Sequence, residues 1–93
     1  MESKIKYEIL KPDFGAKSFY GKAKTCEVNG WKILKSYDTH VAAISPKGEF
    51  FRLWGAYSAT TARHIATFMR VNGLRAICKA DWIKLPIMHL EGV

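Results

Sequence analysis

Hydrophobic and polar positions alternate along much of the first sixty residues, a period of two that predicts β-strands. A weak alternation over residues 5–9 ends at the stretch PDFG, so residues 1–17 are expected to form an N-terminal arm or edge strand. The alternation is clearer over residues 18–57. We expect three or four antiparallel strands there, connected as a meander.

Asn29-Gly30 is the strongest local signal in the chain, because this dipeptide suits the two positive-φ positions of a type I′ turn. Alternating segments, SFYGKAKTCEV and WKILKSYDT, flank it and predict a hairpin. Asp38-Thr39 is expected to form either a second turn or a bulge within one long strand. Pro46-Lys47-Gly48 predicts a further reversal.

The pattern changes to the period of an amphipathic helix over residues 58–73. Ser58 and Thr60 both suit its N-cap, since a hydroxyl accepts an unpaired amide proton of the first turn. Asn72-Gly73 is expected to end the helix. A helical wheel predicts a buried side of Thr61, Ile65, Phe68 and Met69. The same wheel predicts an exposed side of Thr60, Arg63, Thr67 and Arg70, with His64 on the flank.

A short helical turn is expected over residues 78–86, with Cys78 in the cap position and Asp81 three residues later. A thiol is a weak acceptor, so this element should be marginal, and Pro86 should end it. The predicted fold class is therefore α+β: a small antiparallel sheet packed by one amphipathic helix, plus this C-terminal turn.

Length and composition place the chain among globular proteins of one domain, spanning residues 1–93. No apolar run reaches the ~20 residues of a membrane span, and the N-terminus lacks a signal-peptide core. Cys26 and Cys78 lie far apart and are expected to be reduced thiols. These features predict a cytoplasmic protein without membrane contact.

The charge balance indicates the kind of partner. Fifteen Lys and Arg residues against eight Asp and Glu give a net charge of +7. Such an excess attracts nucleic acid, nucleotides or an acidic protein face, although it also serves solubility alone.

Candidate residues for an anionic partner fall in two regions. Three hydroxyl residues in SATTARH surround a predicted helix N-terminus, where free amides and the helix dipole favour anions, although redundant capping is the simpler interpretation. Lysines of the first hairpin, near Tyr20 and Tyr37, form a mixture of cations and rings that suits nucleic acid, or else a solvated sheet face. The expected contact residues are Lys22, Lys24, Lys32, Arg52, Tyr57, Thr60, Arg63, His64 and Arg70.

Catalytic and metal chemistry have little support in the sequence. Asp38-Thr39-His40 is accompanied by no nucleophile motif, paired carboxylates or phosphate-binding loop. The three histidines and two cysteines lack metal-ligand spacing. We therefore expect no catalytic residues, no metal and no cofactor.

The segments SFYGKA, SYDTHVA and YSATTARHI together resemble a family of small, functionally unassigned domains encoded mostly by bacteriophages and prophages. The resemblance covers most of the chain, about residues 17–73, but carries no activity that transfers to particular residues. It implies a location in the cytosol of a host bacterium. It also implies a context in which small phage proteins inhibit host immunity or regulate nucleic acid.

Two hypotheses of function follow from these observations. The first is a non-enzymatic, phage-encoded inhibitor of anti-CRISPR type, which engages a nucleic acid-loaded host complex through its basic surface. The alternative is a small DNA- or RNA-binding regulatory protein. A hydrolase or nucleotide-binding protein using His40 or His64 is a distant third.

Overall fold

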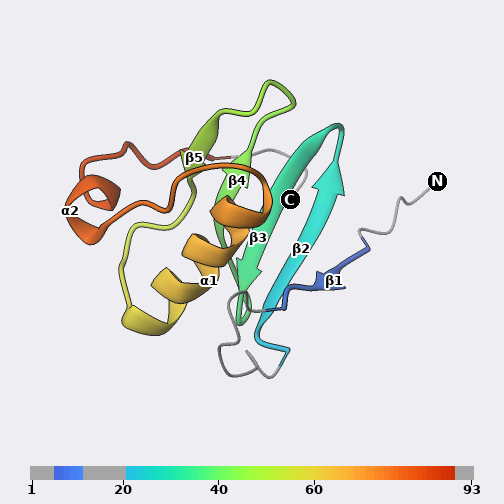
Figure 1. Ribbon diagram of the computed structural model, residues 1–93, viewed down its shortest axis with the longest axis horizontal. Coiled ribbons are helices and arrows are strands. Elements are labelled where there is room, and N and C mark those ends of the chain that lie inside the picture. Colours follow the sequence, from blue (N-terminus) through green and yellow to red (C-terminus); the bar gives the residue numbers. More distant parts are fainter. Residues whose placement is uncertain (1–5, 12–20, 90–93) are drawn as a thin grey trace.

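The computed structural model describes residues 6–11 and 21–89, which form one antiparallel sheet with helices on one side (Figure 1). The sheet has five strands in the order β1-β2-β3-β4-β5, and the α+β class is confirmed. The expected strand residues 18–20 lie outside the described residues. In chain order the elements are β1 (Glu8–Ile9), β2 (Ala23–Val28), β3 (Trp31–Ser36), β4 (Thr39–Ile44), β5 (Phe50–Arg52), α1 (Ala59–Val71) and α2 (Lys79–Trp82).

The hairpin between β2 and β3 forms at the predicted dipeptide. Asn29 and Gly30 have φ angles of 52° and 84°, and Val28 pairs with Trp31 across the turn. Positive φ at both central residues is the requirement of a type I′ turn. This turn fixes the register of the whole β2–β3 pair.

The reversal between β3 and β4 is a turn, which was one of the two alternatives for Asp38-Thr39, and not a bulge within one long strand. The turn lies one residue earlier than expected, at Tyr37 and Asp38, and Tyr37 adopts a φ of 55°. The register of β3 and β4 also shifts between Leu34 and Lys35, which leaves Val41 as an extra residue in β4. This bulge lies within β4 and is separate from the turn.

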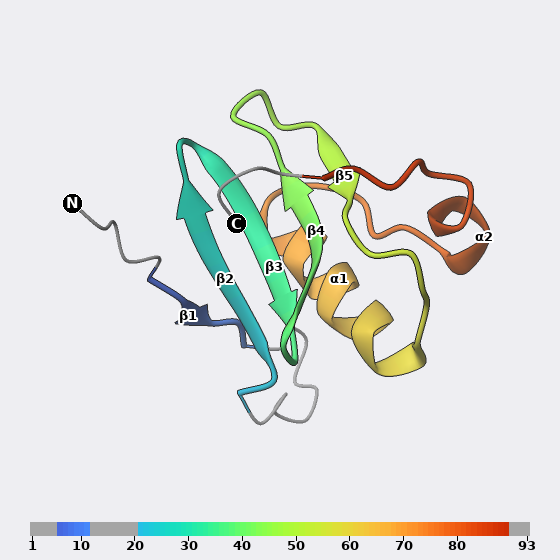
Figure 2. The same ribbon diagram turned by 180° about the vertical axis from the view of Figure 1, so that it is seen from behind.

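Helix α1 lies across one face of the sheet and forms the main core with it. Small and aliphatic side chains of the strands meet the apolar stripe of the helix there. The buried members include Ala23, Leu34, Ala42 and Ile44 from the strands and Ile65, Phe68 and Met69 from α1. In the described part of the chain no helix covers the other face, which Figure 2 shows toward the viewer. We call this the open face.

Both ends of α1 have the predicted caps. The Ser58 hydroxyl accepts the Thr61 amide, so Ser58 is the N-cap and Thr60 lies within the helix. At the C-terminus the amides of Gly73 and Leu74 donate to the carbonyls of Arg70 and Met69. These two bonds, with Gly73 at a φ of 79°, make a Schellman motif.

The helical wheel was wrong for two polar residues of α1. Thr67 and His64 were expected on the exposed side and its flank, but both are buried, 2% and 1% exposed respectively. The His64 ring is hydrogen-bonded to the Ser36 hydroxyl, which also bonds Thr61. A polar side chain can be buried when it has a hydrogen-bond partner. A helical wheel that assigns every polar residue to the exposed side therefore misplaces such residues.

Helix α2 is shorter than the expected 78–86. Its N-cap is Cys78, as predicted, but the thiol accepts no amide proton and instead donates to the Asp81 carboxylate at 3.4 Å. Trp82 anchors α2, because its side chain is buried and its indole N–H donates to the carbonyl of Ala56.

Candidate nucleic-acid interface

The three lysines expected on the hairpin do not share one surface. The register places Lys24 opposite Lys35 and Lys32 opposite Glu27. Since neighbouring strand residues point to opposite faces, Lys24 lies on the open face and Lys32 on the helix side. The expectation that Lys32 lies opposite Lys22 and Lys24, the lysines of the first hairpin strand, was therefore wrong. Lys22 is exposed and immediately precedes β2.

Arg52 is a structural residue, which corrects its expected role in partner contact. It is 7% exposed, and its guanidinium donates to four backbone carbonyls around the end of α2. The acceptors are Trp54, Trp82, Ile83 and Leu85, at 2.8 to 3.3 Å. Its guanidinium carbon also lies 5.1 Å from the centre of the Trp82 ring. These contacts and its burial show that the Arg52 side chain serves the fold.

The expected anion site at the N-terminus of α1 loses most of its donors to the fold. Ser58 caps the helix, and His64 is buried against Ser36. Burial also lowers the pKa of His64, which favours its uncharged form. Thr60 and Arg63 stay exposed there, but hydroxyls and imidazole do not converge on a common point in solvent.

The other predicted residues are exposed but dispersed. Arg63 and Arg70 lie on the side of α1 that faces away from the sheet. Tyr57 lies before α1, and the ammonium of Lys79 is 5.2 Å from the centre of its ring. These residues therefore form basic surface remote from the open face.

The open face carries a row of basic side chains across three strands. Lys24 of β2 pairs with Lys35 of β3, and Lys35 pairs with His40 of β4. Like charges directly opposite in a sheet repel each other, so we expect Lys24 and Lys35 to repel each other. An anion bound between the two ammonium groups would relieve that repulsion.

Sequence reasoning missed Lys35, although the signal was available. A two-residue turn at Asn29-Gly30 makes Val28 and Trp31 partners, and counting outward places Lys24 opposite Lys35. The hairpin was predicted, but its register was not carried along the strands.

Tyr7 connects this row to the N-terminal segment. Its hydroxyl is hydrogen-bonded to His40 Nε2 at 2.7 Å, and the Lys35 ammonium lies 4.9 Å from the centre of its ring. Burial and the nearby Lys35 charge lower the pKa of His40. Neutral imidazole can accept a hydrogen bond from the tyrosine hydroxyl, and the Tyr7 ring also lies beside the Lys35 ammonium.

The reactive groups near this row are held in unreactive forms. Burial raises the pKa of the Cys26 thiol, and it also raises the pKa of the Tyr7 hydroxyl. A cysteine attacks as its thiolate, so a raised pKa weakens it as a nucleophile at neutral pH. Neither group is therefore activated as a nucleophile at neutral pH.

Aromatic side chains occupy the opposite end of the open face. Trp31 and Phe51 are half-buried, and their ring centres are 5.5 Å apart with an angle of 46° between the planes. They pack beside a small second core of Cys26, Ile33 and Ala43. This end of the face therefore presents two rings next to solvent.

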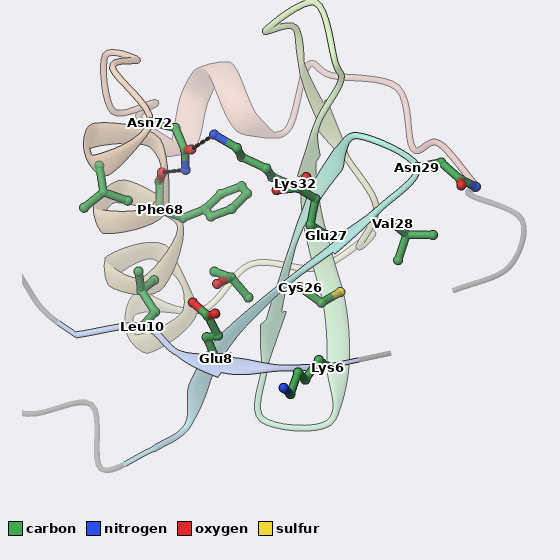
Figure 3. Close-up of a pocket in the computed structure, with 12 residues that line it drawn as sticks. Lys6, Glu8, Leu10, Cys26, Glu27, Val28, Asn29, Lys32, Phe68 and Asn72 are labelled. Carbon is green, nitrogen blue, oxygen red and sulfur yellow. Dashed lines mark hydrogen bonds between the residues drawn. The ribbon is translucent and has the colours of Figure 1, made fainter. Parts of the chain in front are cut away.

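The acidic side chains of the strands lie on the other side. Among the described strands, Glu8 and Glu27 are the acids, and both flank open-face positions and so point to the helix side. There they line a groove of 640 Å³ beside Phe68 of α1 (Figure 3). Lys32 also lines it and donates to Asn72 Oδ1 at 2.9 Å. The groove thus mixes charges, whereas the open face is basic.

Two further findings on the described residues concern metal binding and membrane spanning. Over residues 6–11 and 21–89, no three His, Cys, Asp or Glu side chains gather in a way that could hold a metal ion. No helix in these ranges has the length and apolarity to cross a membrane.

The fold and the open face define a small α+β domain with a basic and aromatic sheet surface that no helix of residues 6–11 and 21–89 covers. Residues 10–84 match a family of unknown function, DUF8033, and the chain belongs to this family. This agrees with the expected resemblance to a functionally unassigned family. No curated protein and no solved structure matches the chain.

Proposed function

We propose that this protein is a non-enzymatic domain that binds nucleic acid through the open face of its sheet. The observation that carries the proposal is the separation of charge between the two faces. The strands direct Lys24 and Lys35 to the open face, and they direct Glu8 and Glu27 to the helix side. A phosphate backbone approaching the open face therefore meets cations without opposing strand carboxylates.

The proposal selects binding over catalysis because of the state of the nearby groups. His40 favours its neutral form, and Cys26 favours its thiol form. Neither arrangement activates a nucleophile at neutral pH, whereas two lysines paired across neighbouring strands favour an anion.

A second candidate is the inhibitor hypothesis, in which the partner is a nucleic acid-loaded complex of a bacterial host and the protein is phage-encoded. The same basic row supports it, since Lys24 and Lys35 would contact phosphates of the bound nucleic acid. A cytosolic location fits both candidates, because Cys26 and Cys78 are free thiols. Capture from bacterial lysate with and without nuclease treatment distinguishes a protein target from nucleic acid alone.

The test of the main proposal is a salt titration of affinity for an oligonucleotide. We expect log affinity of the wild-type protein to fall linearly with log salt. In Lys24→Gln/Lys35→Gln the slope should flatten by about 0.7 for each single-strand phosphate that the variant no longer neutralises.

Arg63→Gln/Arg70→Gln is the matched control, since it removes the same charge from the outer side of α1. It should change the slope less than the lysine variant does. Absence of wild-type binding at low salt would contradict the proposal. A flattened slope only in the arginine variant would move the interface to α1, the other region that the sequence left open.

A further inference from the structure

We infer that the open face selects single-stranded over double-stranded nucleic acid, by stacking unpaired bases on Trp31 and Phe51. This inference rests on the proposed function and adds the class of nucleic acid. Lysines alone would bind the phosphates of either form, so the selectivity must come from the aromatic end of the face.

The rings are placed so that a flat group can reach them. Trp31 and Phe51 are half-buried, and their register places them on the open face, which no helix of the described residues covers. Every base has a π-face, so stacking on such rings is tolerant of sequence. In a duplex the base faces are covered by neighbouring pairs, and only an unpaired base can stack on a protein ring.

The face is long enough to require several nucleotides. Val28 lies four residues after Lys24 in β2, and it pairs with Trp31. At ~3.3 Å per residue this is about 13 Å between the lysine row and the aromatic pair. A B-form strand carries one phosphate per ~3.4 Å of helix axis, so one nucleotide cannot serve both ends. An extended strand with bases on the rings and phosphates on the lysines fits the face.

Tryptophan fluorescence can report on the aromatic end, because the other two tryptophans lie elsewhere. Trp82 is 1% exposed, and Trp54 packs against the core on the helix side. Stacking on Trp31 should therefore account for any quenching of tryptophan fluorescence by a bound oligonucleotide.

The experiment compares an oligothymidylate of about ten nucleotides with a duplex of equal length at the same salt concentration. The wild-type protein should bind the single strand more tightly and lose tryptophan emission on binding. Trp31→Leu or Phe51→Leu should weaken single-strand binding by roughly 5- to 150-fold and leave duplex binding nearly unchanged. Trp31→Phe should keep part of the preference, and melting temperatures identify any variant that fails to fold.

The outcomes separate the two proposals. Equal affinity for single strand and duplex, with salt-dependent binding of both, would overturn the single-strand inference and leave nucleic-acid binding intact. Unchanged single-strand affinity in folded Trp31→Leu and Phe51→Leu would overturn it as well. No binding of either form would overturn the proposed function itself.

Discussion

His64 shows how a single polar residue ties the sheet to the helix. It is almost fully buried, and its Nδ1 lies 2.8 Å from the Ser36 hydroxyl, which also bonds Thr61. The three groups satisfy one another without a charge. Protonation of His64 would place a charge in this buried position, which burial disfavours.

We therefore predict that the protein loses stability as the pH falls below about 6.5, the ordinary pKa of histidine. The folded-state pKa values of His64 and His40 are lowered, so the unfolded chain binds more protons between the folded and unfolded values. The free energy of unfolding then rises with pH across that window. Thermal melts between pH 5 and 8 measure this effect.

His64→Gln keeps a hydrogen-bonding side chain and removes the titration, so its melting temperature should depend less on pH over this range. A pH dependence as large as that of the wild type in both His64→Gln and His40→Gln would show that neither histidine causes it.

At the residue scale the sequence overestimated exposure of polar side chains. Arg52 and His64 were placed at a partner surface because each is polar and lies near other candidates. Their burial depends on distant acceptors, the carbonyls around α2 for Arg52 and Ser36 for His64. A one-dimensional pattern does not contain those tertiary partners.

The elements were predicted more successfully than the residues on them. The turn at Asn29-Gly30, the Ser58 cap and the Asn72-Gly73 stop all depend on local backbone preference, and each appears where expected. The strand faces were harder, because the bulge at Val41 and the turn at Tyr37 shift the alternation.

Gly30→Val should destabilise the protein by about 1–3 kcal/mol, because a β-branched residue would be strained at a φ of 84°. A Cβ at this position would also lie 3.0 Å from Pro46 Cγ. Gly48→Val is the control, since Gly48 has a φ of 88° but no atom within 4 Å of its added Cβ. Chemical denaturation should show the larger loss for Gly30→Val, and an unchanged midpoint would contradict the tight turn.

On α1 we expect Arg63→Gln/Arg70→Gln to change stability by no more than about 0.5 kcal/mol per site, since both side chains are exposed. Thr67→Gln should cost about 1–3 kcal/mol, because the larger side chain enters a buried position. Melting temperatures of the two variants compare these effects. A larger loss in the arginine variant would mean that the exposed side of α1 is assigned incorrectly.

At the scale of the whole molecule, the two sides of the sheet carry different kinds of side chain. The helix side holds the main core and the strand carboxylates, and the open face holds adjacent lysines and two half-buried rings. The net charge predicted an anionic partner. Only the register of the hairpin shows that Lys24 and Lys35 lie together on the open face. The pairing of the strands therefore determines which face of the sheet carries these lysines.

The most direct test of this account is amide chemical-shift mapping during titration with oligothymidylate. The account predicts that the largest changes occur at Lys24, Lys35 and Phe51 and at the backbone and indole signals of Trp31. Changes confined to the outer side of α1, around Arg63 and Arg70, or to the groove beside Phe68, would contradict it.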